Sequence, residues 1–528
     1  MSPRPGFILE VDRSTPPTLF WHGERFSMEK LPVGSRVIYA PEPEAALEDP
    51  IGAIRHALEH PLGDSPPLSA RLTAGMKLTI AFDDISLPLP PMRRPDIRQL
   101  VIEQVLDLAA EAGVDDVVLI CALALHRRMT AAELRHALGD RIYDAFEPQG
   151  LLQQHDAEDP TNLVHLGLTD QGEDVEINKR AAESDLLVYV NINLVAMDGG
   201  HKSVATGLAS YKSLRHHHNA KVMTHSTSFM DQHKSELHSS NWRMGRLIAA
   251  AGVKVFQIET TLNSDTFPEQ FRFLQRREWE WSAKDRATYL GASAALDRTP
   301  SKLARNIFQS IKAPHRMTSV QAGEVEAVHA QTTANVYRQQ LVAVEGQTDI
   351  LTMGLPYICP YNVNSIMNPI LVACLGLGYF FNLYRGKPLV REGGVLIMSH
   401  PTPWEFNPVH HPSYIDFFEQ VLSQTTDPAE IGKYEESFAT DPWYIHLYRT
   451  GNAYHGVHPF YMWYWCAHAL EHLGAVIVVG GDRAAVRRLG FKPASSMADA
   501  LEMASDVVGR DPSLTHLHTP PVMLADVT

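Results

Sequence analysis

The feature that most constrains the fold is a regular alternation of apolar runs and helical segments that begins near residue 78. Residues 78–82, 117–123 and 186–190 are apolar runs of strand length. Apolar residues recur at helical spacing over residues 95–113. A capping box at residues 130–133 opens another helix, which we expect to end before Gly139. This alternation predicts a largely parallel sheet with helices on both faces.

A second series of apolar runs follows, and it predicts a second α/β half. Its candidate strands cover residues 254–259, 349–353, 395–399 and 475–479. A chain of 528 residues is too long for one hydrophobic core and suits at least two domains. We therefore expect two α/β domains with a cofactor and substrate cleft between them.

The remaining segments complete the predicted domain organisation. Residues 1–75 are rich in proline and read as an N-terminal extension with short strands at 7–11 and 36–40. The first domain then covers 76–250 and the second 251–515. Within the second domain lies a long insertion at about 401–460, rich in aromatic residues, proline and histidine. A span of that length between core strands is typical of a lid, a pocket wall or a buried subdomain.

Composition restricts the partners and the compartment. The formal net charge of −15 and the lack of a long basic block argue against nucleic-acid binding. The four cysteines lie in apolar surroundings without a CxxC pair, so we expect buried free thiols in a reducing compartment. No signal peptide is visible, and the longest apolar stretch, 369–381, is shorter than the ~20 residues of a membrane helix. We expect a cytoplasmic protein without membrane contact, and the sequence leaves homo-oligomer formation open.

Lys202 is the first candidate functional residue. It follows the third apolar run and the double-glycine turn Gly199-Gly200, so a basic group is expected at the mouth of the sheet. The segment is not a nucleotide phosphate loop, because His201 stands where that loop needs glycine. The glycines would still let backbone N–H groups approach an anion. A solvated lysine on a tight turn explains the segment equally well.

Other candidates follow apolar runs in the same way. His126 stands just after the second run and is a plausible general base, or a residue that merely precedes a helix cap. Asp84 and Ser86 follow the first run and either bind ribose or phosphate oxygens or form an Asx turn. His218 ends a triple histidine that we expect on a helix, where at most one ring faces a given site.

Together, these segments resemble the lactate racemase family over roughly residues 75–505. The matching segments are Asp84-Ile-Ser-Leu-Pro88, His126-Arg-Arg-Met-Thr130, Gln154-His-Asp156, Gly199-Gly-His-Lys202 with Gly207, His218, Pro360-Tyr-Asn-Val-Asn364, and Leu489-Gly-Phe491 with Ala500-Leu501. Members of this family use a nickel-pincer nucleotide, a pyridinium-3,5-bisthiocarboxylic acid mononucleotide that carries nickel.

The resemblance implies a role for each matching residue. Lys202 would attach the cofactor through a thioamide, His218 would ligate nickel, and His126 would act as a catalytic base. The positions that would contact the cofactor are Asp84, Ser86, His155, Gly199, Gly200 and Lys202. Imidazole and sulfur donors in a square-planar set suit nickel.

The departures from the family concern the substrate. The arginine that holds the substrate carboxylate falls at Leu87, and the second catalytic histidine falls at Ile192. The glutamine and lysine of the second domain fall at Met367 and Ile370. Arg127, Arg93 or Arg94 would have to meet a carboxylate instead. The second base stays open among His155, His201, His329, His455, His458 and a bound water. We therefore expect a substrate bulkier or less polar than lactate.

The implied activity is that of a racemase or epimerase of a 2-hydroxy acid. A base takes the hydroxyl proton while the cofactor accepts hydride, and return of the hydride to the opposite face inverts the carbon. The implied partners are a hydroxy-acid substrate and the enzymes that build the cofactor. Two alternatives are other hydride chemistry on the same fold and a non-catalytic nucleotide-binding homologue. A zinc hydrolase is disfavoured, because the chain has no HExxH or comparable ligand spacing.

Overall fold

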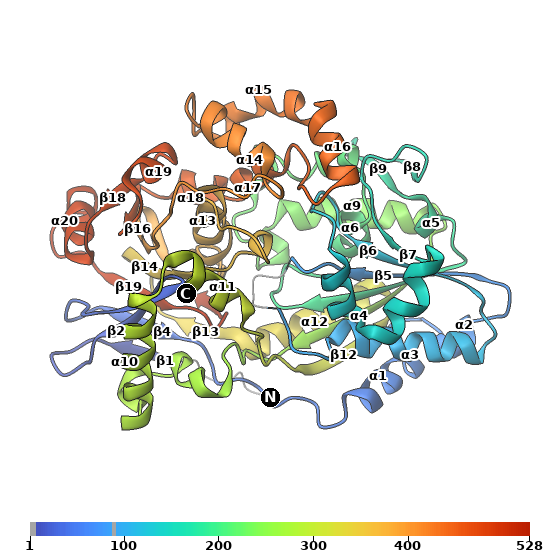
Figure 1. The fold of residues 1–528 in the computed structure, drawn as a ribbon, viewed down its shortest axis with the longest axis horizontal. Helices are drawn as coiled ribbons and strands as arrows, with labels where there is room; N and C mark the ends of the chain where they lie inside the picture. Colours follow the sequence, from blue (N-terminus) through green and yellow to red (C-terminus); the bar gives the residue numbers. More distant parts are fainter. Residues whose placement is uncertain (1–6, 87–90) are drawn as a thin grey trace.

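Two mainly parallel sheets, each covered by helices, form the molecule. The computed structural model describes residues 7–86 and 91–528. One sheet lies in each half of the molecule, and the chain crosses between the halves several times (Figure 1). The expected fold class, two α/β halves, is confirmed.

The first sheet forms from the apolar runs that begin at residue 77. Its order is β12-β11-β10-β5-β6-β7, and all neighbours are parallel except β11 and β12. The strands are β5 (Lys77–Asp83), β6 (Asp116–Ala122), β7 (Leu152–Gln154), β10 (Leu186–Asn193), β11 (Val255–Leu262) and β12 (Met317–Gly323). Every residue of β10 is buried, because this strand lies in the centre of the sheet.

The helices of the first half begin where the sequence predicts. Asp96 caps α3 (Ile97–Glu111), and Thr130 and Glu133 form the capping box of α4 (Ala131–Phe146). The expectation that the helix ends before Gly139 is confirmed in the backbone geometry. Gly139 has φ 80° and ψ 161°, so it interrupts the helix, and a second helical segment continues α4 to Phe146. A glycine can adopt that conformation without the strain a side chain would add.

The second sheet recruits strands from both ends of the chain. Its main order is β1-β4-β19-β14-β16-β17-β18, and β2 pairs with both β14 and β3. The strands are β1 (Phe7–Glu10), β2 (Thr18–Gly23), β3 (Arg25–Glu29), β4 (Arg36–Tyr39), β14 (Thr348–Pro356), β16 (Val390–Ser399), β17 (Ala475–Val479), β18 (Lys492–Ala494) and β19 (Leu514–His518).

The division into sheets therefore differs from the division predicted along the sequence. The strands of segment 1–75 are integral to the second sheet, whereas β11 and β12, expected in the second half, pair within the first. Hydrophobic runs reveal that a strand exists, but pairing depends on contacts between distant residues.

The insertion at 401–460 folds into short helices that join the two halves. They are α14 (Pro412–Asp416), α15 (Pro428–Ala439), α16 (Pro442–Thr450) and the start of α17 (His458–Tyr464). In Figure 1, α15 and α16 (orange) lie across the top of the molecule. Arg449 of α16 pairs with Asp156 at 2.9 Å, and the His455 backbone N–H donates to the Leu125 carbonyl at 3.1 Å. The insertion thus contacts the loops that follow β6 and β7.

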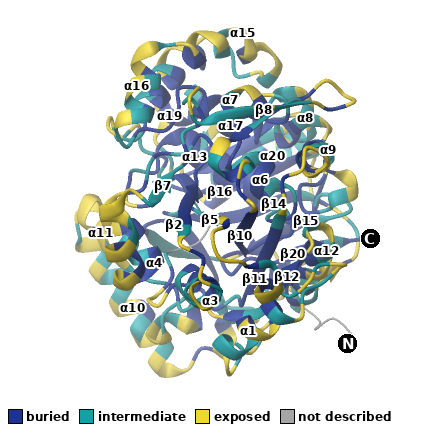
Figure 2. Ribbon diagram, turned by 90° about the vertical axis from the view of Figure 1, so that its right-hand side faces the viewer, coloured by how far each residue is buried: buried dark blue, intermediate teal, exposed yellow. Residues whose placement is uncertain are grey.

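The interior is apolar, as the predicted strands require. Figure 2 shows the strands of both sheets buried beneath partly exposed helices. All four cysteines are free and buried, as expected. None of the helices in residues 7–86 and 91–528 has the length and apolar character needed to cross a membrane.

One buried tyrosine tests the contact between the insertion and the first half. The Tyr448 hydroxyl donates to the Ala124 carbonyl at 2.9 Å and accepts from the Ala157 N–H at 3.0 Å. We expect Tyr448→Phe to lower the free energy of unfolding by about 1–3 kcal/mol, because two buried backbone groups lose their partner. Urea unfolding measures this loss.

Tyr434→Phe is the matched control. Tyr434 lies on α15 in the same insertion, and its hydroxyl has no hydrogen bond to any described residue. We expect a change below about 0.5 kcal/mol. Equal effects of the two substitutions would contradict the bridging role of Tyr448.

Candidate functional site

A small polar pocket lies at the carboxyl ends of β5, β6 and β10. Its volume is about 110 Å³. Five of the predicted site residues line it, namely Asp84, Ser86, His126, Gly199 and Lys202. In open parallel sheets this edge is where ligands bind. The parallel register brings the residues after three separate strands to one place.

His126 is held by a buried carboxylate. Its Nδ1 lies 2.9 Å from Oδ2 of Asp84, which is only 7% exposed. Burial alone would raise the pKa of Asp84, but the His126 imidazole and two hydrogen bonds from Ser86 hold it below its usual value. An ionised Asp84 accepts a hydrogen bond from the Nδ1–H group of His126, and this leaves Nε2 on the far side of the ring available to a ligand.

The double-glycine turn is fixed by a second buried carboxylate. Gly199 and Gly200 have φ values of 90° and 62°, and the Gly200 N–H donates to Glu259 Oε1 at 2.6 Å. A Cβ on Gly200 would lie 2.7 Å from the His329 ring. The expected use of Gly200 for an anionic cofactor finds no support in this geometry, because its N–H is already bound to Glu259.

The turn presents Lys202 to the pocket at the start of α6 (Lys202–Gly207). Its Nζ makes two long contacts, each of 3.3 Å, with the Met197 carbonyl and Asp198 Oδ1. The side chain is 23% exposed. The amine is therefore accessible and weakly held, as a covalent attachment point requires.

His218 does not lie on a helix, contrary to expectation. The triple histidine follows α7 (Tyr211–Leu214) in a turn before α8 (Ala220–His225). His216 pairs with Asp174, and Nδ1 of His217 lies 2.8 Å from Nδ1 of His218. The tautomer in which His218 donates this hydrogen bond leaves its Nε2 lone pair free, as a metal ligand needs.

Electrostatic effects tie His218 to the pocket. Burial, followed by the charges of His217, Lys202 and His126, keeps the pKa of His218 well below its usual value. His218 therefore stays neutral and lies within electrostatic range of both pocket residues. The predicted amine and base thus line one pocket, whereas His218 does not line it and stacks on Tyr461 with ring centroids 5.1 Å apart.

Other predicted positions lie elsewhere. His155 is buried, with Nε2 2.9 Å from the Ala209 carbonyl and Nδ1 near Asn178, so it has no free nitrogen for a cofactor. Ile192 lines the pocket with its apolar side chain, whereas Met367 and Ile370 are fully buried in the core. Leu87 lies outside the described residues.

The three arginines considered for a substrate carboxylate are not in this pocket. Arg127 is buried in a two-pronged ion pair with Glu133, at 2.7 and 3.0 Å. Arg94 pairs with Asp140 at 3.1 Å. Arg93 lines a different cavity. Lys202 is thus the cationic side chain among the described residues that line the small pocket.

Among the candidates for a second base, the structure brings His458 to His126. The centroids of the two rings are 5.4 Å apart, and His458 Nδ1 bonds the Tyr414 hydroxyl at 2.5 Å. Its Nε2 is buried without a partner. The other candidates are engaged, since His201 pairs with Glu326, His329 with Glu259 and His455 with Glu158.

The aromatic insertion therefore forms a wall beside His126, as one reading of the sequence proposed. Tyr361 and Tyr454 also lie against the His126 ring, with centroids at 5.2 and 6.2 Å. Burial, and the charges of His126 and other histidines, keep the pKa of His458 well below its usual value, so the ring is neutral. No periodic pattern in residues 401–460 could have singled out this histidine.

Asp83 is a pocket residue that sequence reasoning left without a role. It accepts hydrogen bonds from the Ile192 N–H and Asn191 Nδ2, both at 2.8 Å, and from the Tyr189 hydroxyl. Burial, with the nearby charges of Asp198 and Asp84, raises the pKa of Asp83 to about 7 against the opposing hydrogen bonds. Its position directly before Asp84 at the end of β5 was the available signal.

A conventional protein metal site is not built here. Within residues 7–86 and 91–528, no group of three or more His, Cys, Asp or Glu side chains is arranged to hold a metal ion. A metal bound by His218 would take its other ligands from a bound organic group.

Comparison with known proteins gives a consistent family. Residues 26–231 match the model of the lactate racemase N-terminal domain. The lactate racemase of Lactiplantibacillus plantarum is 28% identical over 174 residues, which are 32% of this chain and 38% of that protein. The lactate racemase of Thermoanaerobacterium thermosaccharolyticum is 27% identical over 170 residues, 31% of this chain and 37% of that protein. The matched part is thus well under half of either relative.

Solved structures extend the likeness to the whole fold. The apoprotein of the Thermoanaerobacterium thermosaccharolyticum lactate racemase superposes with a TM-score of 0.62 at 17% identity, covering 96% of this chain and 99% of that one. A Thermotoga maritima protein gives a TM-score of 0.51 at 13% identity, covering 92% and 100%. Both similarities concern the fold alone.

The raised pKa of Asp83 predicts a pH-dependent stability. A carboxyl with a pKa of about 7 when folded and about 4 when unfolded binds its proton more tightly in the folded state. Its contribution is complete below pH 4 and is lost as the pH rises through 7. Because pocket water weakens the effect, we expect wild type to lose about 1–2 kcal/mol more than Asp83→Asn between pH 5 and 7.

Urea unfolding of both proteins at the two pH values measures the difference. Asp116→Asn is the control, since Asp116 stands at the other end of the neighbouring strand β6 and its pKa is lowered. If wild type and Asp83→Asn lost stability in parallel, the protonated state of Asp83 would be excluded.

Proposed function

Because this chain is a divergent relative of the lactate racemases, we propose that it is a racemase or epimerase that inverts the carbinol carbon of a 2-hydroxy acid other than lactate. We propose further that it uses a nickel-pincer nucleotide attached at Lys202 and ligated by His218. The observation that carries the proposal is one accessible amine, Lys202, and one imidazole, His126, in a single pocket at the sheet edge, with the buried His218 ring within electrostatic range of both.

The donor set suits such a cofactor. Lys202 has only long contacts to give up, and His218 keeps one nitrogen free. The Oδ1 atom of Asn191, another pocket residue, is buried without a partner and would accept a hydrogen bond from a ligand. The volume of about 110 Å³ is below the ~300 Å³ typical of ligand sites, so the pocket must widen to admit a whole nucleotide.

The cofactor would supply the hydride acceptor, and this chain would supply the proton chemistry. His126 Nε2 would take the hydroxyl proton of one enantiomer, with Asp84 stabilising the charged ring that results. A ketone forms when the carbinol hydrogen leaves as hydride. The carbon would be inverted when the hydride returns to the opposite face of the carbonyl carbon and a proton returns to its oxygen. We assign the second base to His458, which lies against His126 with a free nitrogen.

The pocket wall favours a substrate larger or less polar than lactate. Arg127 and Arg94 are both occupied by carboxylates, and the rings of Tyr361 and Tyr454 lie beside His126. Aromatic faces bind apolar substituents more readily than small hydrophilic ones. In this proposal Lys202 would lie near the substrate carboxylate only through the cofactor that it carries, and not as a free amine.

The first test of the proposed function concerns the attachment of the cofactor. Protein produced together with cofactor-building enzymes should carry a nucleotide-sized mass adduct, mapped to Lys202, and one nickel per chain. Lys202→Ala should lose the adduct, whereas Lys212→Ala should keep it, because Lys212 pairs with Asp174 on the surface. His218→Ala should keep the adduct but lose at least about 90% of the nickel, and His216→Ala should retain it.

Intact-mass spectrometry and metal analysis give these readouts. An adduct on another residue, or nickel that persists in His218→Ala, would refute the assigned attachment. Stoichiometric zinc without nickel would instead favour a hydrolytic function.

The route of the carbinol hydrogen is the second prediction. A hydroxy acid deuterated at the carbinol carbon should keep its label in the inverted product, because hydride does not exchange with water. His126→Gln and His458→Gln should each lower the rate of inversion about 100-fold or more, in keeping with loss of a general base. His446→Gln, an exposed histidine of the same insertion, should leave the rate unchanged.

Mass spectrometry of the product and chiral chromatography measure label and rate. Complete loss of deuterium to water would show that the carbinol hydrogen leaves as a proton and not as a hydride. Oxidation or reduction without inversion would favour other hydride chemistry on this fold.

A further inference from the structure

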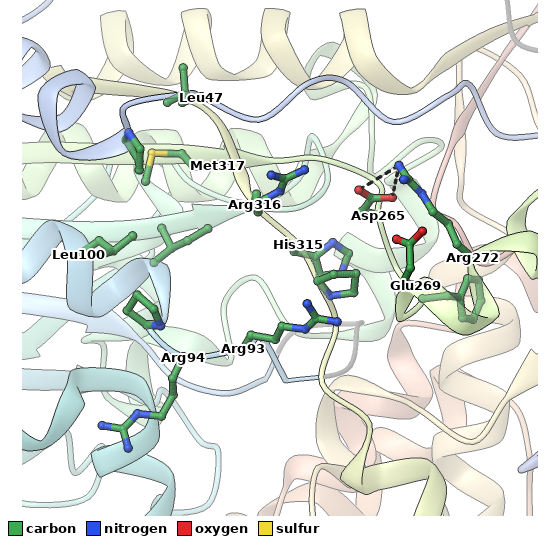
Figure 3. A pocket seen from close by; sticks show the side chains of 15 residues that line it. Leu47, Arg93, Arg94, Leu100, Asp265, Glu269, Arg272, His315, Arg316 and Met317 are labelled. Carbon is green, nitrogen blue, oxygen red and sulfur yellow. Dashed lines mark hydrogen bonds and ion pairs between the residues drawn. The ribbon is translucent and has the colours of Figure 1, made fainter.

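A second, larger cavity lies apart from the catalytic pocket and shares no lining residue with it. It has a volume of about 460 Å³, which falls within the range of small-molecule sites. Its walls come from the segment before α3, the segment after β11, the start of β12 and the residues around the start of α1 (Pro50–Glu59) (Figure 3).

Unpaired positive charge gathers in this cavity, although the whole chain is acidic. Four arginines line it, namely Arg93, Arg94, Arg272 and Arg316, against two carboxylates, Asp265 and Glu269. Arg94 is paired with Asp140, and Arg272 with Asp265 at 3.0 Å. The side chains of Arg93 and Arg316 form no hydrogen bond or ion pair with any described residue. In Figure 3 their guanidinium groups lie on either side of the His315 ring.

His315 provides an independent sign of a missing ligand. It is 6% exposed, its Nδ1 lies 3.0 Å from the Asn263 carbonyl, and its Nε2 has no partner. Burial lowers the pKa of His315 to about 4, so the ring is neutral. Nδ1 then carries the proton that it donates to Asn263, and Nε2 is an unsatisfied acceptor. A buried acceptor without a donor is unfavourable, because it has lost its hydrogen bond to water.

We propose that this cavity binds a small hydroxylated carboxylate, whose carboxylate is held by Arg93 and Arg316 and whose hydroxyl donates to His315 Nε2. Guanidinium groups bind carboxylates through strong, charge-assisted hydrogen bonds. Nε2 is covered from solvent, so binding requires the His315 ring to turn toward the ligand. Leu100 and Met317 line the apolar side of the cavity and face the carbon chain of the ligand.

The site is independent of the proposed catalysis, and it is tested with full-length protein free of cofactor. The protein carries Lys202→Ala, so that the catalytic pocket loses its cationic side chain. Isothermal titration with D-gluconate should reveal one saturable site with a Kd near ~1 mM. Hexanoate, a carboxylate without hydroxyl groups, should bind at least about tenfold more weakly, because it leaves His315 Nε2 unsatisfied.

Substitutions test which residues bind the carboxylate of the ligand and which residue binds its hydroxyl. Arg93→Ala with Arg316→Ala should weaken gluconate binding at least about tenfold, whereas Arg94→Ala, at a paired arginine of the same cavity, should change it less than about twofold. His315→Phe should abolish the preference for gluconate over hexanoate.

Failure to bind gluconate saturably, or equal binding by the double arginine variant, would overturn the site. If the cavity without substitutions bound hexanoate as tightly as gluconate, the role of the ligand hydroxyl would be overturned. Neither result bears on Lys202 or His218, so the proposed catalysis is judged separately.

Discussion

The buried Glu259 carboxylate is the constraint on which the arrangement of the site depends. It accepts the Gly200 N–H at 2.6 Å and the Gln257 side-chain amide at 3.1 Å, and it lies 3.2 Å from His329 Nδ1. A carboxylate that is fully buried needs such partners, and together they fix the turn that carries Lys202. Glu259 stands on β11, which pairs with the central strand β10. The hydrogen bonds of Glu259 therefore fix the position of the Lys202 amine relative to the first sheet.

The insertion supplies the other side of the site. Its contacts with the loops after β6 and β7 bring His458 and Tyr454 against His126, and Tyr361, which precedes the insertion in the second half, lies against the same ring. A site shared between halves can change its volume when they move relative to one another. This offers a physical route by which a pocket of about 110 Å³ would admit a nucleotide.

The sequence predicted elements more reliably than their partners. Apolar runs located β5, β6, β10 and β14 within a few residues, because strand burial leaves a local pattern. Sheet membership of β11 and of the N-terminal strands could not be read, since pairing joins residues far apart in the chain.

The same distinction holds for the site. Asp84, His126 and Lys202 follow strands and could be expected at one edge, whereas His458 reaches that edge through an insertion without periodicity. The expected use of Gly200 and His155 for a cofactor stays a prediction, and the geometry does not favour it. Their polar groups had protein partners that no local pattern reveals.

The central claim is that Lys202 and His218 hold opposite parts of one bound organometallic group beside His126. Anomalous diffraction at the nickel absorption edge, from crystals of protein produced with the cofactor-building enzymes, tests it most directly. We expect one anomalous nickel peak bonded to the His218 imidazole, with continuous electron density from the metal-bearing ring to the Lys202 side chain. A nickel peak elsewhere in the chain, or density that leaves Lys202 unmodified beside a filled pocket, would contradict it.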